Sequence, residues 1–563
     1  MGEDPAYPGV RPYRRADSAR FRGRASEADE LGTAWLQNQL TYLCGPAGIG
    51  KTSLLVAGVL PRVEGRKAAI AVLPVGGVNG QTDTGPGTAP VSDYTLSGTR
   101  YPVAALPEHN PYSFALLRSW SDAGTAAQMA SKPIDEFIGT YLARNPDKVI
   151  LAAIDQADDL FAGPHGRQPL RRRFLDQLAA VLRDEPRLHL LVSVRDDCLR
   201  QFTEVIGDGV QVRVDQLGVP AAREVITSAN VFADDAAYEL VASLQGGNAA
   251  APAPTASGTG GMIEPLLLQV VCAGLWAYLR PQVSVITVRD LRQHGDVNTD
   301  SLLSDYCAAG VRSVADTHEI SAERLRSWLL GTFITSTGEL ASAPEGWPDT
   351  AGVPTTAVRA LEDRYLLRAH RVPTASPPPG TLPSQAAVPR PRPTPPPRWY
   401  TLLSDRLMEP LRSAGGTAGQ AEPDPGEYLR AAERARVTGE HDLASRLAAQ
   451  VLEIAPATSL RLHADAHTLV GDLAYERGRL DKAEESYRTA MLFFQSCGEQ
   501  AAAARLLAAI ARTYLDRGRV LDALNYMQAS LRRVADAALH ENLLWVLQVA
   551  AQQAASSPPG STG

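Results

Sequence analysis

The chain has 563 residues, of which 44% are hydrophobic and 21% charged, and its formal net charge is -7. This length exceeds one ordinary hydrophobic core, so several soluble globular domains are expected. The charge balance argues against bulk binding to nucleic acid or anionic lipid, and five scattered cysteines without a CxxC pair argue against a disulfide framework or a zinc site. A polar N-terminus and the lack of a membrane-length apolar run predict a cytoplasmic protein without a membrane span.

Three short, nearly continuous apolar runs predict strands buried on both faces of a parallel sheet. They are NQLTYLCG (38–45), KVILAAID (148–155) and LHLLVSVR (188–195). Helical segments such as PLRRRFLDQLAAVLRDE (169–185) alternate with them, and helices dominate from about residue 216. The expected fold class is therefore multidomain, with an α/β parallel-sheet domain followed by α domains.

A phosphate-binding loop follows the first of these strands. Its residues match G-x-x-x-x-G-K-[ST] and are Gly45, Pro46, Ala47, Gly48, Ile49, Gly50, Lys51 and Thr52. An apolar helix that begins near Ser53 follows the loop. Loop amides and the helix N-terminus would bind phosphate oxygens. Lys51 would reach the β- and γ-phosphates, and Thr52 would ligand Mg²⁺. The alternative is a glycine-rich turn that binds nothing.

The choice of lysine in this loop favours nucleotide binding. The chain has 55 lysines and arginines, of which only five are lysine. Arginine is available almost everywhere else, but its wide planar fork does not fit a loop closed around a phosphate. The sequence therefore predicts an ATP or ADP site in which Lys51 is required.

Acidic residues follow the second predicted strand. Asp155 stands at its carboxyl end, where a Walker B aspartate holds Mg²⁺. The next residue is Gln156, where most fast ATPases have a catalytic Glu, so slow hydrolysis is expected. Asp158 and Asp159 are candidates to orient a water molecule, and the equally weighted alternative is that they supply helix N-terminal charge on a solvated face.

The third predicted strand ends in Arg195. An arginine at a strand end beside the phosphate cleft is a candidate γ-phosphate sensor. The alternative is a surface salt bridge with Asp196 or Asp197. The position relative to the other two strands favours the sensor.

Three stretches rich in Gly, Pro, Ser and Thr predict irregular segments, at residues 76–100, 246–261 and 373–397.

The last third repeats with spacings of 39 and 40 residues at Gly439, Gly478 and Gly518. An alanine follows each glycine by five residues (Ala444, Ala483, Ala523), which allows antiparallel helices to pack closely. These units resemble tetratricopeptide repeats, best at Gly471, Gly478, Ala483, Tyr487 and Ala490.

Residues 6–413 resemble the novel STAND class of P-loop NTPases, signal-transducing switches related to NACHT and plant-resistance ATPases. The resemblance rests on YPGVRPYRRADSARFRGRASE, IDQADDLF, SVRDDCL, IEPLLLQVVCAGLW and RWYTLLSDRLMEPLR. It implies that Gly23 and Arg24 line the nucleotide base and ribose, and that Pro265 contacts the adenine. The last segment resembles the close of a winged-helix domain, where a His of the family touches the diphosphate of ADP. Ser404 stands at that position here, and since a serine can hydrogen-bond a phosphate, the resemblance implies that Ser404 contacts the nucleotide.

A winged helix also suits DNA reading, and Arg390, Arg392 and Arg398 form a small basic cluster. The neutral surroundings favour an internal lid over DNA binding. Together, the resemblance, the repeats and the composition predict six segments: an N-terminal segment (1–35), a P-loop NTPase domain (36–215), a helical domain (216–310), a winged-helix domain with a Pro-rich wing (311–415), TPR-like repeats (416–550) and a disordered tail (551–563).

The resulting hypothesis is a switch operated by ATP or ADP with Mg²⁺. Its C-terminal repeats would sense a protein or peptide trigger, and the ATP-bound form would open and oligomerise. Because the resemblance begins by residue 6, output is expected to pass to a separate effector protein. The alternatives are an ATP-dependent transcription regulator that binds DNA through the winged helix, and a nucleotide-binding scaffold without turnover.

Overall fold

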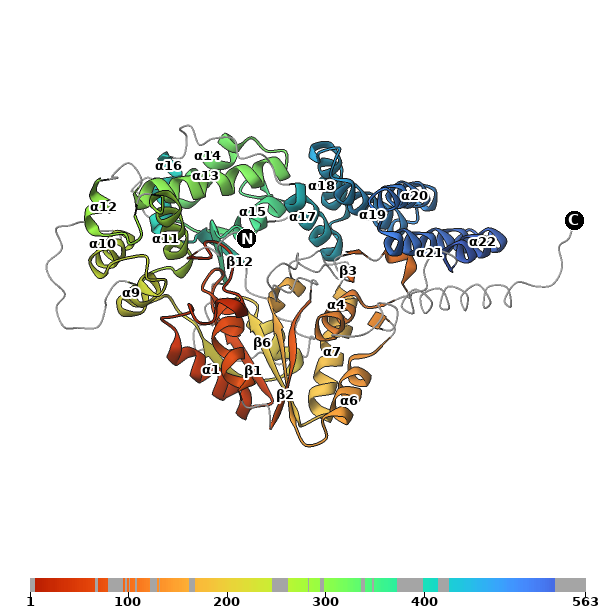
Figure 1. The fold of residues 1–563 in the computed structure, drawn as a ribbon, viewed down its shortest axis with the longest axis horizontal. Helices are drawn as coiled ribbons and strands as arrows, with labels where there is room; N and C mark the ends of the chain where they lie inside the picture. The colour runs from red at the N-terminus through yellow and green to blue at the C-terminus, as the bar shows by residue number, and fades with distance from the viewer. Residues whose placement is uncertain are drawn as a thin grey trace, which may run out of the picture.

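A computed structural model gives the fold (Figure 1). It describes residues 6–65, 69–78, 95–96, 99–100, 102–106, 109–121, 129–130, 132–161, 168–245, 262–281, 283–293, 298–335, 340–346, 349–371, 398–413 and 425–531. The predicted Pro-rich wing, the irregular stretch 246–261 and the predicted tail 551–563 lie outside these residues, as does the end of the predicted repeats.

The chain forms a five-stranded parallel sheet, which lies in the lower part of Figure 1. Its strand order is β2 (Ile70–Gly77), β5 (Val149–Asp155), β6 (Leu188–Val194), β1 (Leu40–Cys44), β7 (Val210–Arg213). The three strands predicted from apolar runs are present as β1, β5 and β6. They lie side by side with β6 in the middle, so their carboxyl ends meet at one edge of the sheet.

Two further strands, β2 and β7, were not predicted, and β2 corrects part of the irregular stretch expected at 76–100. Gly76 and Gly77 pair with β5, and the register shifts between Val72 and Val75 around a proline. A Cβ on Gly76 would lie 2.5 Å from Leu116 and 2.7 Å from Trp120, so these side chains leave room only for glycine at position 76. Farther along, β3 (Thr95–Leu96) pairs with β4 (Thr99–Arg100).

Helices cover both faces of this sheet. On one face α1 (Ala25–Gln37) packs with the helix after the phosphate loop, which comprises α2 (Lys51–Ser53), the π-helical η2 (Leu54–Val59) and α3 (Leu60–Glu64). The other face carries α4 (Pro111–Trp120), α6 (Ile134–Arg144), α7 (Gln168–Asp184) and α8 (Leu199–Ile206). Strands buried on both faces explain the continuous apolar runs in the sequence.

A helical layer lies above the sheet in Figure 1 and shares one hydrophobic core. Its helices are α9 (Val219–Thr227), α10 (Asp234–Leu244), α11 (Pro265–Leu279), α12 (Val288–Gln293), α13 (Thr299–Thr317), α14 (Ala322–Phe333), α15 (Thr355–Asp363) and α16 (Met408–Ser413). A small antiparallel sheet follows the order β11 (Leu367–Arg371), β12 (Arg398–Leu402), β8 (Ala343–Pro344), and β9 (Asp349–Thr350) pairs with β10 (Val353–Pro354). The boundary predicted at 310/311 falls within α13.

Three helical hairpins make up the C-terminal part. They are α17 (Pro425–Thr438) with α18 (His441–Ile454), α19 (Leu460–Glu476) with α20 (Leu480–Ser496), and α21 (Gln500–Asp516) with α22 (Val520–Leu531). The glycine between the helices of each pair has a positive φ, of 88°, 70° and 75° in chain order. The alanines predicted to permit close packing, Ala444, Ala483 and Ala523, are each 0% exposed.

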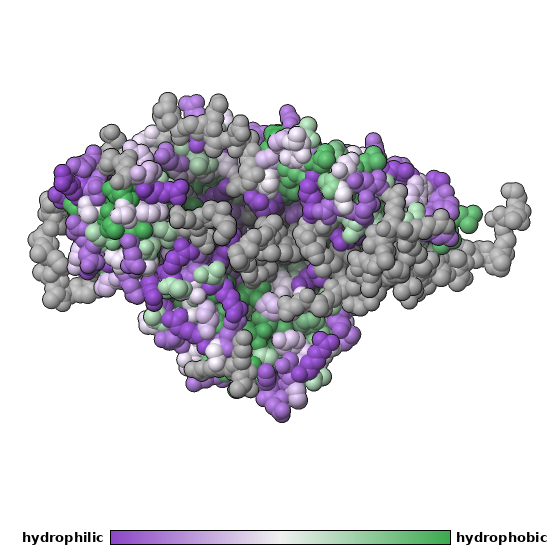
Figure 2. Space-filling model, in the orientation of Figure 1, coloured by the Kyte–Doolittle hydropathy of each residue, from purple (hydrophilic) through white to green (hydrophobic). Residues whose placement is uncertain are grey.

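On the face shown in Figure 2, hydrophilic side chains predominate and hydrophobic ones form separate patches. Among the described residues, no helix is both long enough and apolar enough to cross a membrane.

Candidate functional site

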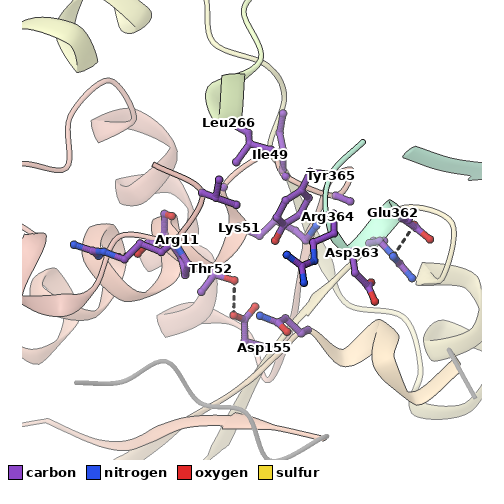
Figure 3. A pocket seen from close by; sticks show the side chains of 18 of the residues that line it. Arg11, Ile49, Lys51, Thr52, Asp155, Leu266, Glu362, Asp363, Arg364 and Tyr365 are labelled. Atoms are coloured by element: carbon purple, nitrogen blue, oxygen red, sulfur yellow. Dashed lines mark hydrogen bonds and ion pairs between the residues drawn. The ribbon is translucent and has the colours of Figure 1, made fainter. Parts of the chain in front are cut away.

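A cavity of about 740 Å³ opens at the carboxyl edge of the sheet. Its walls come from the phosphate loop, the strand ends after β5 and β6, the N-terminal segment, α11, α15 and the first C-terminal hairpin. Figure 3 shows Lys51 and Thr52 facing Arg364 and Tyr365 across this space. The volume is within the range of small-molecule and cofactor sites.

The phosphate loop has the conformation that its glycines permit. Gly48 and Gly50 have φ values of 75° and 97°, which L side chains rarely adopt. The Nζ of Lys51 donates to the carbonyls of Gly45 and Pro46 at 2.8 and 3.0 Å. Burial lowers the pKa of Lys51, and the nearby Asp158 opposes that shift. The ammonium group therefore lies folded over its own loop, within the cavity wall.

Thr52 and Asp155, the two residues expected to hold Mg²⁺, are in direct contact. The Thr52 hydroxyl donates to Oδ2 of Asp155 at 2.6 Å (Figure 3), while Oδ1 of Asp155 is buried without a hydrogen-bond partner among the described residues. Buried carboxylate oxygens in folded proteins normally bind a hydrogen-bond donor, a water molecule or an ion. Hydroxyl and carboxylate oxygens are ligands that Mg²⁺ accepts, so the residues fit that ion.

Arg195 lies at the centre of a buried ion-pair cluster. Its guanidinium contacts Asp158 at 2.9 Å and Glu362 of α15 at 2.6 Å. Burial alone would lower the pKa of Arg195, but these two carboxylates, with Asp197, outweigh it and raise the pKa. Of the two roles weighed for Asp158, solvated helix charge does not fit, since the residue is only 7% exposed.

Arg398 joins the same cluster from β12. It contacts Asp197 at 3.0 Å and Glu362 at 2.7 Å, and its side chain is 10% exposed. This corrects the basic cluster considered for DNA, because a buried arginine with two carboxylate partners is not available to a DNA phosphate. Arg390 and Arg392 lie outside the described residues.

The N-terminal segment lies against the phosphate loop. Arg24 is 5% exposed, lines the cavity, and donates to the carbonyl of Asp215 at 2.6 Å. A Cβ on Gly23 would lie 2.6 Å from the carbonyl oxygen of Ala221, so the close approach of α9 requires glycine there. The Ser53 hydroxyl accepts a hydrogen bond from the Tyr13 amide at 3.1 Å.

The remaining predicted residues divide into two groups. Ala47, Ile49, Asp155, Asp158 and Pro265 line the cavity, with Pro265 in the first turn of α11. Gly23, Gly45, Pro46 and Ser404 do not line it. The Ser404 hydroxyl instead caps the short helix η6 (Asp405–Leu407), accepting from the Arg406 amide at 3.2 Å, so the expected contact of Ser404 with a diphosphate has no counterpart in this geometry.

The model of the family described as Novel STAND NTPase 1 matches residues 6–324, more than half of the chain. The chain belongs to this family. The match begins in the N-terminal segment, runs through the phosphate loop and the strand ends that surround the cavity, and ends within α14. The chain is therefore a STAND-type P-loop NTPase, as the sequence motifs predict.

Solved structures similar to this STAND NTPase include two proteins from species of Pyrococcus. The Walker-type ATPase of Pyrococcus abyssi is 13% identical, with 72% of this chain and 99% of that chain covered and a TM-score of 0.36. A signal transduction ATPase with numerous domains and a tetratricopeptide repeat sensor, from Pyrococcus horikoshii, is 12% identical, with 98% and 70% covered and a TM-score of 0.28. No curated protein matches the chain.

Two cavity residues of this STAND NTPase, Glu362 and Tyr365, were missed by the sequence reasoning. Glu362 lies one helical turn after Val358 on the buried face of α15. A carboxylate at such a position is the signal that could have revealed a buried ion pair. Tyr365 has a φ of 56° and its ring lies over Gly48, where a Cβ on the glycine would be 3.3 Å away. Burial raises the pKa of Tyr365 to about 12.

Proposed function

We propose that this STAND NTPase is a signalling switch that binds ATP or ADP in the cavity at the edge of its sheet. One observation carries the proposal: residues of the NTPase part, of α15 and of the first C-terminal hairpin all line the same cavity. A nucleotide there would contact every part of the chain that must move relative to the others. Its presence, and the number of its phosphates, could therefore bias the whole arrangement.

Within the phosphate loop, backbone amides would bind the phosphates and Lys51 would turn from its loop carbonyls toward them. Thr52 and Asp155 would hold Mg²⁺, which would neutralise phosphate charge. Gln156 occupies the position after Asp155, lines the cavity and has a φ of 52°. Since an amide is no general base, hydrolysis would be slow.

The lid on this site would be the unit that contains α13, α14, α15 and the β11–β12 pair, which we propose is a winged helix. Glu362 and Arg398 come from this unit and hold Arg195 and Asp197 of the NTPase part. Arg195 could reach a γ-phosphate only if it left Glu362. Binding of ATP would in this way compete with the closed lid.

The C-terminal hairpins would form a TPR-like sensor for a protein or peptide trigger. Arg430, Glu440 and Leu447 place the first hairpin at the cavity wall. Trigger binding would favour the open, ATP-bound form, which would oligomerise and act on a separate effector protein. DNA binding through the winged helix is less favoured, since Arg398 is buried.

The test of nucleotide binding compares two lysines in the full chain. Lys51→Ala should weaken binding of a fluorescent ADP by about 10- to 150-fold, because charge-assisted hydrogen bonds contribute about 1.5–3 kcal/mol. Lys482→Ala removes an exposed lysine of α20 and should bind like the wild type. Equal affinities in all three proteins would contradict the proposed site.

Single-turnover hydrolysis of labelled ATP separates a switch with turnover from a scaffold without it. Asp155→Asn should slow hydrolysis relative to the wild type, because the Mg²⁺ ligand loses its charge. Identical traces from the wild type, Lys51→Ala and Asp155→Asn would favour the scaffold. A DNA probe that shifts at low salt and not at high salt would favour the transcription regulator.

A further inference from the structure

A five-residue segment of the NTPase part lies against the C-terminal helices. It comprises Pro102–Leu106, with the single 3-10 turn η3 (Val103–Ala105) at its centre. The segment contacts α21 and α19, which follow it by more than 350 residues. In Figure 1 this orange region of the chain reaches the blue helix α21.

The side chains of this segment divide between two hydrophobic cores. Leu106 is 4% exposed and belongs to the core on the α4 and α7 face of the sheet, with Val103 packed against the same core. Ala104 and Ala105 are 1% and 0% exposed and belong to the core of α19, α20 and α21. Small side chains therefore enter the C-terminal hairpins, and larger ones anchor the segment in the NTPase part.

A buried carboxylate on α19 binds the backbone of this segment. Oδ1 of Asp472 accepts from the Val103 amide at 2.8 Å and from the Tyr487 hydroxyl at 2.8 Å, and Asp472 is 0% exposed. Burial and the neighbouring Asp472 raise the pKa of Tyr487, which keeps the hydroxyl protonated as a donor. A carboxylate can accept a hydrogen bond from the backbone amide of any peptide, and the space beside it selects small side chains such as alanine. These two features together are sufficient to recognise a short peptide.

We propose that this surface of α19 and α21 is a peptide-binding site of the sensor and that Pro102–Leu106 is its resting occupant. The partner would be a protein segment with two adjacent small side chains and a free backbone amide before them. The inference rests on the proposed sensing role of the hairpins and names the ligand class and its competitor. Displacement of the segment would remove this contact between the NTPase part and helices α19 and α21.

The test releases the resting occupant through a single amide in the full chain. Val103→Pro removes the N–H that Asp472 binds. Position 103 tolerates proline because Val103 is the first residue of the turn and because the preceding residue, Pro102, has an extended ψ of 134°. Val103→Ala shortens the side chain and keeps the amide, which makes it the matched control. The probe is a fluorescein-labelled peptide of residues 100–108, measured by fluorescence anisotropy.

Val103→Pro should bind the probe about tenfold more tightly than the wild type does, since the resting occupant has lost a charge-assisted hydrogen bond. Val103→Ala should bind it as the wild type does, and a probe with proline at position 103 should bind none of them. Equal affinity of all proteins for the probe, or no binding to any of them, would overturn the proposal.

A second variant tests the same docking surface through a side chain instead of the amide. Ala105→Asp puts a carboxylate into the apolar core of the hairpins, whereas Leu492→Asp puts one on α20 at a residue that is 60% exposed. Circular dichroism checks that both fold. Ala105→Asp should expose the site to the probe and Leu492→Asp should not; the reverse, or no difference, would overturn the proposal.

Nucleotide binding, measured on the same samples, separates this inference from the proposed function. If the released variants fail to bind the peptide and still bind fluorescent ADP, the docking surface is wrong and the switch stands. If the wild type binds no nucleotide, the proposed switch is wrong, and the peptide data still decide whether α19 and α21 form a docking surface.

Discussion

His318 illustrates how one side chain of the cavity wall can make stability depend on pH. It follows α13, and its Nδ1 lies 3.5 Å from the Thr356 hydroxyl. Burial, with a smaller contribution from Arg446, lowers the pKa of His318 from 6.5 to about 4. Between these values the unfolded chain binds more protons than the folded chain does. The free energy of unfolding should therefore fall as the pH falls from 6.5 to 4, by at most about 1.4 kcal/mol per pH unit.

The measurement is the thermal midpoint of the wild type and His318→Gln between pH 4 and 7. Relative to the wild type, the variant should become more stable as the pH falls from 6.5 to 4. Above pH 6.5 the difference between the two thermal midpoints should stay constant. Arg446→Gln removes the cation that helps to lower the pKa, so it should reduce the pH effect. Parallel midpoints for the wild type and His318→Gln would contradict the buried neutral imidazole.

Lys51, Thr52 and Asp155 could be located from the sequence because a phosphate loop is local and the strand before Asp155 has a strong apolar pattern. Arg195 was located by the same reasoning, but its partner Glu362 was not. Contacts between residues more than 150 positions apart leave no local pattern. Ser404 shows the opposite case, since a family motif suggested a phosphate contact and the hydroxyl caps its own helix.

At the scale of elements, strands with continuous apolar runs were predictable and interrupted ones were not. β7 has one buried residue among four, and β2 contains a proline and ends in two glycines. The C-terminal hairpins were predictable because their signal repeats. Gly471 and Tyr487 show why that signal exists, since a Cβ on Gly471 would lie 2.5 Å from Cδ1 and Cε1 of the Tyr487 ring.

Gly471→Ala should therefore destabilise the chain. Overpacking costs about 1–3 kcal/mol and outweighs the gain of up to ~1 kcal/mol from placing alanine in a helix. Gly139→Ala in α6 is the matched control, because nothing lies within 4 Å of its Cβ, and it should be neutral or stabilising. Thermal unfolding followed by circular dichroism measures both. A Gly471→Ala protein as stable as Gly139→Ala would show that α19 and α20 do not pack through this ring.

At the scale of the whole molecule, the buried cluster of Arg195, Asp197, Glu362 and Arg398 joins the NTPase part to the helical layer. The sequence predicts an α/β domain followed by helical domains, but not this contact, because its four members come from β6, α15 and β12 and the residues that follow them. Ion pairs between strand ends and a distant helix depend on how the helical layer packs against the sheet. Composition and periodicity carry no information about that packing.

Glu362→Ala should open this junction. The Glu362 carboxylate makes contacts of 2.6 and 2.7 Å with Arg195 and Arg398, so its removal leaves two buried arginines with fewer carboxylates, at a cost of about 3–5 kcal/mol. The expected results are a lower thermal midpoint and faster release of bound fluorescent ADP. Asp300→Ala is the control, because Asp300 pairs with Arg406 but is 59% exposed, and an exposed pair contributes about 0–1 kcal/mol. A Glu362→Ala protein that releases ADP no faster than Asp300→Ala would mean that apolar packing, and not this ion-pair cluster, holds the helical layer against the NTPase part.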